Sequence, residues 1–319
     1  MSPASTEQFL LEQYIGHPAS QLQDLRKALY QSVFGCGHLI TDTSAAAEGI
    51  RRETAEAGPC SREIEALDGP WSRVQLGVLA DGLTPETLSR MFARSAAMSH
   101  GDADALQEKL TVLRRLIRSG ALPYSPAEAD AELDDWRKNG FPVCRHSEEY
   151  RAAYRPAYRV LHRTYVRLLP LLAAIDQALA ENPRVLLAIE GGAASGKSTL
   201  ADLLTAIYPD TALFHADDFF LRPEQRTAAR YAQPGGNLDR ERLESEILIP
   251  ISRNEAAVYR LFDCRTLSLR EPVTVLPGRL NIVEGSYSFH PELARYYDLS
   301  VFLDISPETQ RSRILERNG

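Results

Sequence analysis

The segment Gly191–Ser198 constrains the fold of this chain more than any other part of the sequence. It reads Gly-Gly-Ala-Ala-Ser-Gly-Lys-Ser, which fits the pattern GxxxxGKS. The apolar run Val185–Ile189 precedes it, and the helix-forming stretch Thr199–Leu204 follows it. A strand, a glycine-rich loop and a helix in this order bring backbone N–H groups and the positive end of a helix to one point. The segment therefore predicts a loop that cradles a polyphosphate.

Two side chains of this loop have separate expected roles. Lys197 is expected to place a point charge against the outer phosphates, and the Ser198 hydroxyl is expected to bind Mg²⁺. Lys197 is also the only lysine after Lys138, in a stretch that otherwise uses arginine for positive charge. A glycine-rich turn without a ligand is the alternative interpretation. The residues expected to bind ATP are Gly191, Gly192, Ala193, Ala194, Ser195, Gly196, Lys197, Ser198 and Thr199.

Length and charge limit the classes to which the chain can belong. Its 319 residues are enough for two domains that each bury a core. The net charge of −7 argues against a mainly nucleic-acid-binding surface, because such surfaces carry an excess of lysine and arginine. No segment has the roughly 20 apolar residues of a membrane span, and the N-terminus has no basic and apolar leader pattern.

The cysteines are few and scattered. Four in so long a chain do not form a disulfide framework. We therefore expect a cytoplasmic protein, and the sequence specifies no oligomeric state. The four are Cys36, Cys60, Cys144 and Cys264.

The sequence changes character near residue 183. Residues 1–180 carry mostly helical start and stop signals, although Trp71–Leu79 alternates like a strand. Pro156 opens an amphipathic stretch that is expected to continue as helix through Ala180, and Glu181-Asn182-Pro183 ends it. We expect a mostly helical domain of unknown role over residues 1–180 and a second domain over residues 184–319.

Beyond Pro183 the pattern is that of an α/β domain. Short apolar runs alternate with helix-forming segments. The expected strands are Val185–Glu190, Ala212–Ala216, Val258–Phe262, Leu280–Glu284 and Val301–Ile305. The expected helices are Ser198–Ile207, Arg240–Ile251 and Pro307–Arg317. This order predicts the three-layer αβα fold of P-loop NTPases with a mainly parallel sheet, whose ligands bind beyond the carboxyl ends of the strands.

Acidic residues follow two of these expected strands. Asp217 and Asp218 come after the second run, beside the phosphate loop. Phosphoryl transfer to a hydroxyl requires an acceptor for the hydroxyl proton and acids that hold Mg²⁺, and these aspartates fit both needs. An exposed acidic turn is the alternative. Glu284 ends another strand and precedes Gly285, which suits a metal ligand, whereas we expect Asp304, the second candidate, to cap its own strand.

Together these residues resemble the P-loop family of uridine kinases and phosphoribulokinase-like small-molecule kinases. The resemblance covers residues 184 to 319, and its order and spacing are more specific than the loop alone. The similar positions are Gly191–Thr199, Asp217-Asp218-Phe219-Phe220, Gly235–Asp239, Glu284-Gly285 and the arginines Arg311, Arg313 and Arg317.

The resemblance implies roles for several of these positions. Asp217 would be the general base for the accepting hydroxyl, and Asp239 would bind sugar hydroxyls through its two acceptor oxygens. Asp217, Ser198 and Glu284 would hold Mg²⁺. Substrate or lid contacts are implied for Asp218, Tyr259, Arg313 and Arg317.

The chain departs from the family pattern in two places. The stretch Tyr259–Thr266 lacks the histidine with which uridine kinases contact the pyrimidine base. The family domain also continues past the arginine-rich helix into a lid, whereas this sequence ends at Gly319, so a C-terminally truncated domain is one interpretation. We expect ATP- and Mg²⁺-dependent transfer of a phosphoryl group to a hydroxyl of a nucleoside-like or other small metabolite.

Other classes with a phosphate loop fit the sequence less well. GTPases contact guanine with an Asn-Lys-x-Asp block, and no lysine follows Lys197. A Leu-Ser-Gly-Gly-Gln-like signature of transporter ATPases is also absent. The remaining alternative is an ATP-binding regulatory or switch module whose N-terminal domain binds a partner.

Two Cys-x-His pairs, Cys36–His38 and Cys144–His146, lie in the first half of the chain. They could form a Cys₂His₂ zinc site, or Cys36 could be a nucleophile with a histidine as its base. We favour a tight turn with a buried thiol, because Cys-x-His is not a common zinc spacing.

Arginines recur every four residues between positions 151 and 167, and three tyrosines precede them by one position. On a helix they would form a stripe that binds substrate phosphates, an acidic partner or RNA. We favour a solvated face offset by Glu148 and Glu149, interrupted at Pro156. The residues are Arg151, Arg155, Arg159, Arg163 and Arg167, with Tyr150, Tyr154 and Tyr158.

Overall fold

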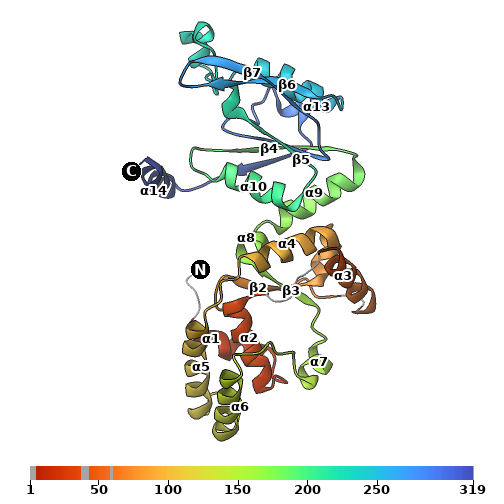
Figure 1. Cartoon of the computed structure of the whole chain (residues 1–319), viewed down its shortest axis with the longest axis vertical. Helices are drawn as coiled ribbons and strands as arrows, with labels where there is room; N and C mark the ends of the chain where they lie inside the picture. The colour runs from red at the N-terminus through yellow and green to blue at the C-terminus, as the bar shows by residue number, and fades with distance from the viewer. Residues whose placement is uncertain (1–4, 37–42, 58–59, 319) are drawn as a thin grey trace. The chain divides into compact units, whose positions relative to one another are not determined.

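The computed structural model describes residues 5–36, 43–57 and 60–318, and it divides into two compact units. Unit 1 comprises residues 1–174 and unit 2 comprises residues 175–319. The division falls within helix α9 (Leu169–Glu181), and the predicted boundary at 180–184 lies at the end of that helix (Figure 1). Within the described ranges, no helix is both long and apolar enough to span a membrane.

Unit 1 is mostly helical and contains a small antiparallel sheet. The sheet runs β1 (Ile64–Ala66), β2 (Trp71–Gln75), β3 (Tyr158–His162), with Trp71 opposite His162. Helix α2 packs against β2, and α4 packs against β3. The helices of this unit are α1 (Thr6–Gly16), α2 (Leu22–Phe34), α3 (Thr43–Ala57), α4 (Pro85–Ala97), α5 (Ala103–Arg118), α6 (Pro126–Lys138), α7 (Glu148–Tyr154) and α8 (Arg163–Val166).

The end of unit 1 differs from the sequence expectation. The stretch from Pro156 to Ala180 is not one helix, because β3 and the short α8 precede α9. Arg155 adopts a left-handed conformation (φ 43°, ψ 57°) that ends α7, and the following Pro156 disfavours the right-handed helical region at this position. The five arginines therefore lie on different elements and form no single helical face. Trp71–Leu79 begins as strand β2 but continues as a 3₁₀ helix, Leu76–Asp81.

Unit 2 is built on a parallel sheet. Its strand order is β5 (Thr211–His215), β8 (Leu280–Glu284), β4 (Val185–Gly191), β9 (Leu299–Leu303). Every residue of β8 is buried, and so are the first five of β4. Strands covered on both faces read as continuous apolar runs, which explains why the sequence predicted them.

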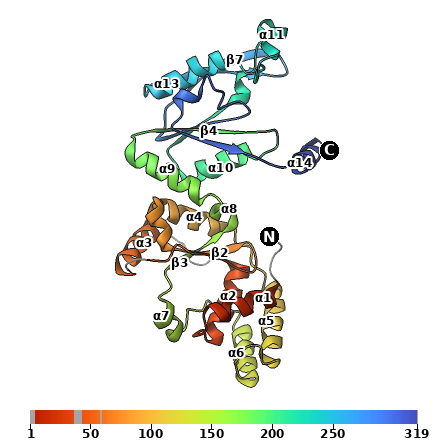
Figure 2. The ribbon, with the colours of Figure 1, turned by 180° about the vertical axis from the view of Figure 1, so that it is seen from behind.

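Helices cover both faces of this sheet. On one face α10 (Lys197–Ile207) packs against β4, β5 and β8, and α9 lies beside it in both views (Figures 1 and 2). The other face carries α12 (Arg240–Leu243), α13 (Ile249–Ser252) and the antiparallel hairpin of β6 (Ala257–Asp263) and β7 (Ser268–Val275). The predicted strand Val258–Phe262 therefore exists, but it belongs to the hairpin.

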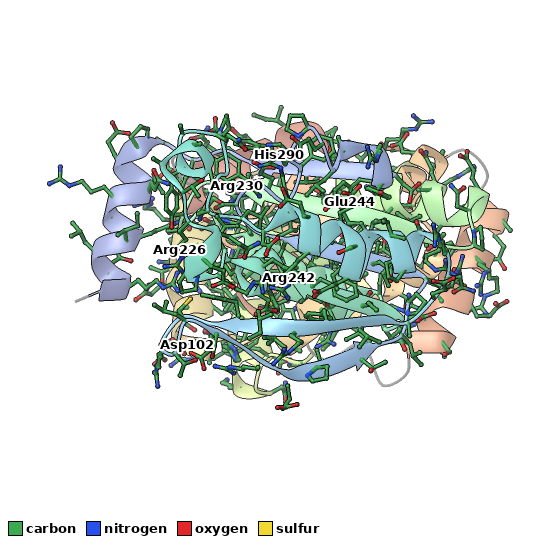
Figure 3. The ribbon with its side chains drawn as sticks, turned by 90° about the horizontal axis from the view of Figure 1, so that it is seen from above. Asp102, Arg226, Arg230, Arg242, Glu244 and His290 are labelled. Atoms are coloured by element: carbon green, nitrogen blue, oxygen red, sulfur yellow. The ribbon has the colours of Figure 1, made fainter. Side chains whose placement is uncertain are left out.

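Arg242 joins α12 to this hairpin and can be located in Figure 3. Its guanidinium lies 5.0 Å from the centre of the Phe219 ring, and Nη2 donates a hydrogen bond to the carbonyl oxygen of Arg260 in β6. The contact fixes the segment that follows β5 against the second layer. Helices α11 (Ala228–Tyr231) and α14 (Pro307–Asn318) complete the unit.

Candidate active site

Three neighbouring strands of unit 2 end at one edge of the sheet. Glu284, the last residue of β8, lies in register with His215, the last residue of β5. The phosphate loop after β4, Gly285 after β8 and Asp217 after β5 emerge at the same edge, because the strands are parallel. A Cβ on Gly285 would lie 2.5 Å from the Cβ of Ala216, so only glycine allows this close approach.

The loop between β4 and α10 is shaped by residues with positive φ. These are Gly191 (φ 153°), Ala194 (φ 58°) and Gly196 (φ 99°). A Cβ on Gly191 would lie 2.6 Å from the carbonyl oxygen of Leu303 and 2.7 Å from the Oγ of Ser195. Gly196 is the N-cap of α10, so the first N–H groups of that helix have no partner within it. Such a helix start attracts anions.

Lys197 lies over this loop. Its Nζ donates hydrogen bonds to the carbonyl oxygens of Gly191 (3.0 Å) and Gly192 (2.9 Å). The ammonium group is therefore held at the same place as the first N–H groups of α10. Both features favour negative charge at the loop.

Helix α14 holds the other side of the loop. Gln310 Nε2 donates to the carbonyl oxygen of Ala193 (2.9 Å), and Arg313 Nη1 donates to that of Ala194 (3.1 Å). Arg317, one turn further along α14, is exposed. The sequence pointed to Arg313 but not to Gln310, whose uncharged side chain gave no signal.

A hydroxyl, a carboxylate and an imidazole meet at the strand ends. Ser198 Oγ donates to Glu284 Oε1 (3.2 Å), and His215 Nδ1 donates to the same oxygen (2.7 Å). Glu284 is 6% exposed. Asp304, the alternative acid, follows β9 and is exposed. Glu284 is thus the strand-end carboxylate that reaches the loop serine.

The charges of this cluster reinforce one another. Burial would raise the pKa of Glu284, but the hydrogen bonds from His215 and Ser198, with the charges of His215 and Lys197, lower it overall. The hydrogen bond to Glu284 raises the pKa of His215, against the effect of burial, and the nearby charges of Asp218 and Asp217 add to the rise. Sequence reasoning assigned no role to His215, although its place at the end of an apolar run was the available signal.

The two aspartates after β5 differ in exposure. Both lie in a single 3₁₀ turn, Ala216–Phe219, and Asp217 is exposed whereas Asp218 is partly buried. Burial, with a smaller contribution from Asp217, raises the pKa of Asp218 even though His215 opposes the rise. Asp217 therefore has the greater access to an incoming ligand.

Two predicted substrate contacts lie away from solvent. The Asp239 side chain is completely buried: Oδ1 accepts from the N–H of Arg242 (3.2 Å) and Oδ2 accepts from Gln225 Nε2 (2.9 Å). Tyr259 is 7% exposed, and its ring stacks on Phe219 at 5.6 Å. Contact of Asp239 with an acceptor stays a prediction, and it requires the segment that covers the carboxylate to move.

Cys36 and Cys144, the cysteines of the two Cys-x-His pairs, are both buried. Burial raises the pKa of Cys36 to about 12 and also raises that of Cys144, so both are thiols at neutral pH. No group of three or more potential metal ligands occurs among the described residues, and His38 lies outside them. His146 instead bonds to Asp24.

Comparison with known proteins adds evidence of structural similarity only. No family model and no curated protein matches the chain. A solved structure described as a possible uridine kinase from Bacillus stearothermophilus is similar over 44% of this chain and 84% of its own, with 21% identity and a TM-score of 0.36. We therefore base the function on the residues of the site.

Proposed function

We propose that the chain is an ATP- and Mg²⁺-dependent phosphotransferase that acts on a hydroxyl of a nucleoside-like or other small metabolite. The observation that carries the proposal is the cluster of Ser198, Glu284 and His215 at the strand ends, beside a loop that leads into α10. Phosphoryl transfer depends on positioning and charge stabilisation, and this cluster supplies both next to an exposed carboxylate, Asp217.

The loop fits the phosphates of a nucleotide. Lys197 and the start of α10 offer positive charge, and the Oγ of Ser195 is buried without a hydrogen-bond partner among the described residues. An unpaired buried hydroxyl is costly, and a phosphate oxygen would satisfy it. We assign the β- and γ-phosphates of ATP to this loop.

The oxygen atoms beside the loop fit Mg²⁺. Ser198 contributes a hydroxyl and Glu284 a buried carboxylate with a lowered pKa, and hard cations prefer such ligands. His215 orients the carboxylate from behind. A bound Mg²⁺ would neutralise the charge of the phosphates.

Asp217 is the group that we assign to the accepting hydroxyl. It follows β5 at the sheet edge where the loop lies, and it is exposed. A carboxylate there can accept the hydroxyl proton as the oxygen attacks phosphorus. Asp218, partly buried with a raised pKa, would lie next to the acceptor.

The test is ATP turnover with Mg²⁺ against a panel of nucleosides, sugars and sugar alcohols. We expect Asp217→Asn to lower kcat by about 100-fold or more, because general-base catalysis contributes at least that much. Asp202→Asn is the matched control: it removes an exposed aspartate on α10 of the same unit, and kcat should stay within about twofold of wild type. Unchanged turnover in Asp217→Asn would contradict the role of Asp217.

A second function is favoured by the burial of Asp239. Its side chain is completely buried and bonded to Gln225 and to the N–H of Arg242, so a ligand cannot reach it in this conformation. An ATP-binding regulatory module needs no such contact. Tight ATP binding that depends on Lys197, with no phosphorylated acceptor from the panel and capture of a partner by residues 1–174, would favour this function over transfer.

A further inference from the structure

Unit 1 contains a cavity of about 600 Å³ that plays no part in the proposed phosphotransferase. Residues of α2, α3 and β3 line it, together with the segment from Arg145 to Pro156. Small-molecule sites commonly enclose roughly 300 to 1,000 Å³. Every lining residue in the described part of the chain belongs to unit 1.

One part of the lining is a connected polar network. His146 Nδ1 donates to Asp24 Oδ1 (2.8 Å), because an ionised carboxylate can only accept. His146 Nε2 then accepts from the Tyr158 hydroxyl (2.6 Å), whose oxygen accepts from Gln31 Nε2 (3.3 Å). His146, Tyr158 and Gln31 line the cavity in fixed orientations.

Asp24 anchors the network from within the core. It is 3% exposed and accepts three further hydrogen bonds, from the N–H and Oγ of Ser147 and the N–H of Gln21. Burial would raise the pKa of Asp24, but these bonds and that from His146 lower it to about 2. Burial lowers the pKa of His146 to about 4, so at neutral pH the ring carries no charge.

Arg159 and Glu53 form a second part of the lining. Two hydrogen bonds join the guanidinium to the carboxylate (2.8 and 2.9 Å), so each neutralises the other. The Arg159 guanidinium also lies 5.9 Å from the centre of the Phe92 ring. Phe92, Val160 and Pro156 give the cavity an apolar surface.

Three further cations line the cavity without a close carboxylate. Across the described ranges, no acid lies within 4.0 Å of Lys27 Nζ or of the Arg145 guanidinium, and Arg151 has only the exposed Glu148 at 4.0 Å. An exposed pair at that distance contributes little. Lys27 is partly buried, and its Nζ donates to the carbonyl oxygen of Cys144 (3.0 Å). The cavity therefore has an excess of positive charge.

We propose that this cavity binds a small phosphorylated metabolite, whose phosphate contacts Lys27, Arg145 and Arg151 and whose organic part packs against Phe92 and Val160. Lys27 belongs to α2, Arg151 belongs to α7, and Arg145 lies in the segment before α7, so three separate segments supply the cations of the lining. A phosphate dianion offers three acceptor oxygens to such a set, whereas a carboxylate offers two in one plane and a single charge. The site is independent of phosphoryl transfer in unit 2.

The experiment measures the binding of ribose 5-phosphate and of inorganic phosphate by calorimetric titration. The full chain carries Lys197→Ala and is kept free of Mg²⁺, so that the phosphate loop of unit 2 does not take up the probe. We expect the double variant R145A/R151A to raise the Kd of ribose 5-phosphate by about 100-fold, since each of the two charge-assisted hydrogen bonds contributes roughly tenfold. Inorganic phosphate should compete for the same site.

Arg155→Ala is the matched control. Arg155 is an exposed arginine of the same segment and does not line the cavity. The Kd of ribose 5-phosphate for this variant should therefore stay within about twofold of that for the parent chain. Equal Kd values for R145A/R151A and Arg155→Ala would overturn the proposal. So would ribose binding as tightly as ribose 5-phosphate, tighter binding of citrate, or no binding of either phosphate probe at about 10 mM.

Discussion

The two units each contain a carboxylate bonded to a histidine, and the two pairs behave in opposite ways. In unit 1, Asp24 and His146 are 2.8 Å apart; in unit 2, Glu284 and His215 are 2.7 Å apart. The His146 side chain is 6% exposed, whereas that of His215 is 46% exposed. The pKa of His146 is lowered to about 4 by burial, and that of His215 is raised by its carboxylate.

The comparison shows that the contact alone does not determine the charge of a histidine. When the ring is buried, the loss of hydration lowers the histidine pKa more than the carboxylate raises it. When the ring is half exposed, the carboxylate has the larger effect and the pKa rises. The carboxylate in unit 1 also accepts hydrogen bonds from the backbone N–H and the Oγ of Ser147 and from the N–H of Gln21, so it holds segments of the fold together. The carboxylate in unit 2 accepts from the hydroxyl of Ser198, and we propose that it holds Mg²⁺.

The largest expected effect is on the stability of unit 1. Asp24→Asn replaces a buried acceptor of four hydrogen bonds by an amide that cannot accept all of them. We expect the free energy of unfolding to fall by about 3 kcal/mol. Urea unfolding followed by tryptophan fluorescence measures it, because Trp71 and Trp136, the chain's two tryptophans, are buried in unit 1.

Asp134→Asn is the control for this prediction. Asp134 is exposed in the same unit and pairs with Arg114 at 2.7 Å. We expect it to cost less than about 0.5 kcal/mol. A similar loss in both variants would contradict a special role for Asp24.

The next effect concerns activity in unit 2. Glu284→Gln keeps the size of the side chain but removes the charge proposed to hold Mg²⁺. We expect kcat of ATP-dependent transfer to fall about 100-fold, or roughly 2.7 kcal/mol in the barrier, with tryptophan-detected unfolding unchanged. Two results would contradict the proposed difference between Asp24 and Glu284. One is an unfolding curve of Glu284→Gln that shifts as far as that of Asp24→Asn, and the other is an unchanged kcat of Glu284→Gln.

The pH dependence of stability tests the histidine of unit 1. Unfolded His146 takes up a proton near pH 6.5, whereas in the fold its pKa is about 4, since burial and the charges of Arg73 and Lys27 outweigh the attraction of Asp24. Between these values the unfolded state binds more protons, so the free energy of unfolding falls as pH drops from about 6.5 towards 4. We expect a loss of about 2 kcal/mol between pH 7 and 4.5.

His146→Asn isolates this contribution. Its side chain does not titrate, so the pH slope of unit 1 should become shallower by most of that amount, whatever its stability at pH 7. Asp24 adds little to the slope: its folded pKa is about 2, and the unfolded carboxyl takes up few protons above pH 4.5, so its share is about 0.1 kcal/mol. An identical slope in both proteins would contradict a neutral, buried His146.

The smallest effect is expected at the loop. Arg313→Ala removes a hydrogen bond from an exposed side chain to the carbonyl oxygen of Ala194. We expect the KM for ATP to rise about threefold with little change in kcat, because the loop loses one support but no charge in contact with the transferred group. A change as large as that of Glu284→Gln would indicate direct contact with the phosphates.

The sequence predicted the central strands and the phosphate loop of unit 2 better than it predicted the hairpin of β6 and β7. The runs that became β4 and β8 are buried on both faces, and the loop between β4 and α10 has an unmistakable pattern of glycines. Glu284 was recognisable because it ends an apolar strand. The hairpin of β6 and β7 was not distinguished from the main sheet, since an apolar run does not reveal its pairing partner.

Unit 1 was less predictable because its organisation depends on distant contacts. Asp24 and His146 are 122 positions apart, and no local pattern connects them. The amphipathic pattern after Pro156 predicted a helix there, but β3 pairs with β2, and tertiary pairing outweighed local periodicity. The cavity joins residues of α2, α3 and β3, so it has no sequence signature.

Lys197 has one more consequence, for proteolysis. Because no other lysine occurs from residue 139 to 319, a lysine-specific protease has a single cleavage site in unit 2, the peptide bond after Lys197. That bond lies in the first turn of α10, where the loop begins to form the helix. A ligand held by the loop would shield the peptide bond after Lys197 from the protease. Loss of the two fragments that this cleavage produces would therefore report that the loop is occupied, without any label on the chain.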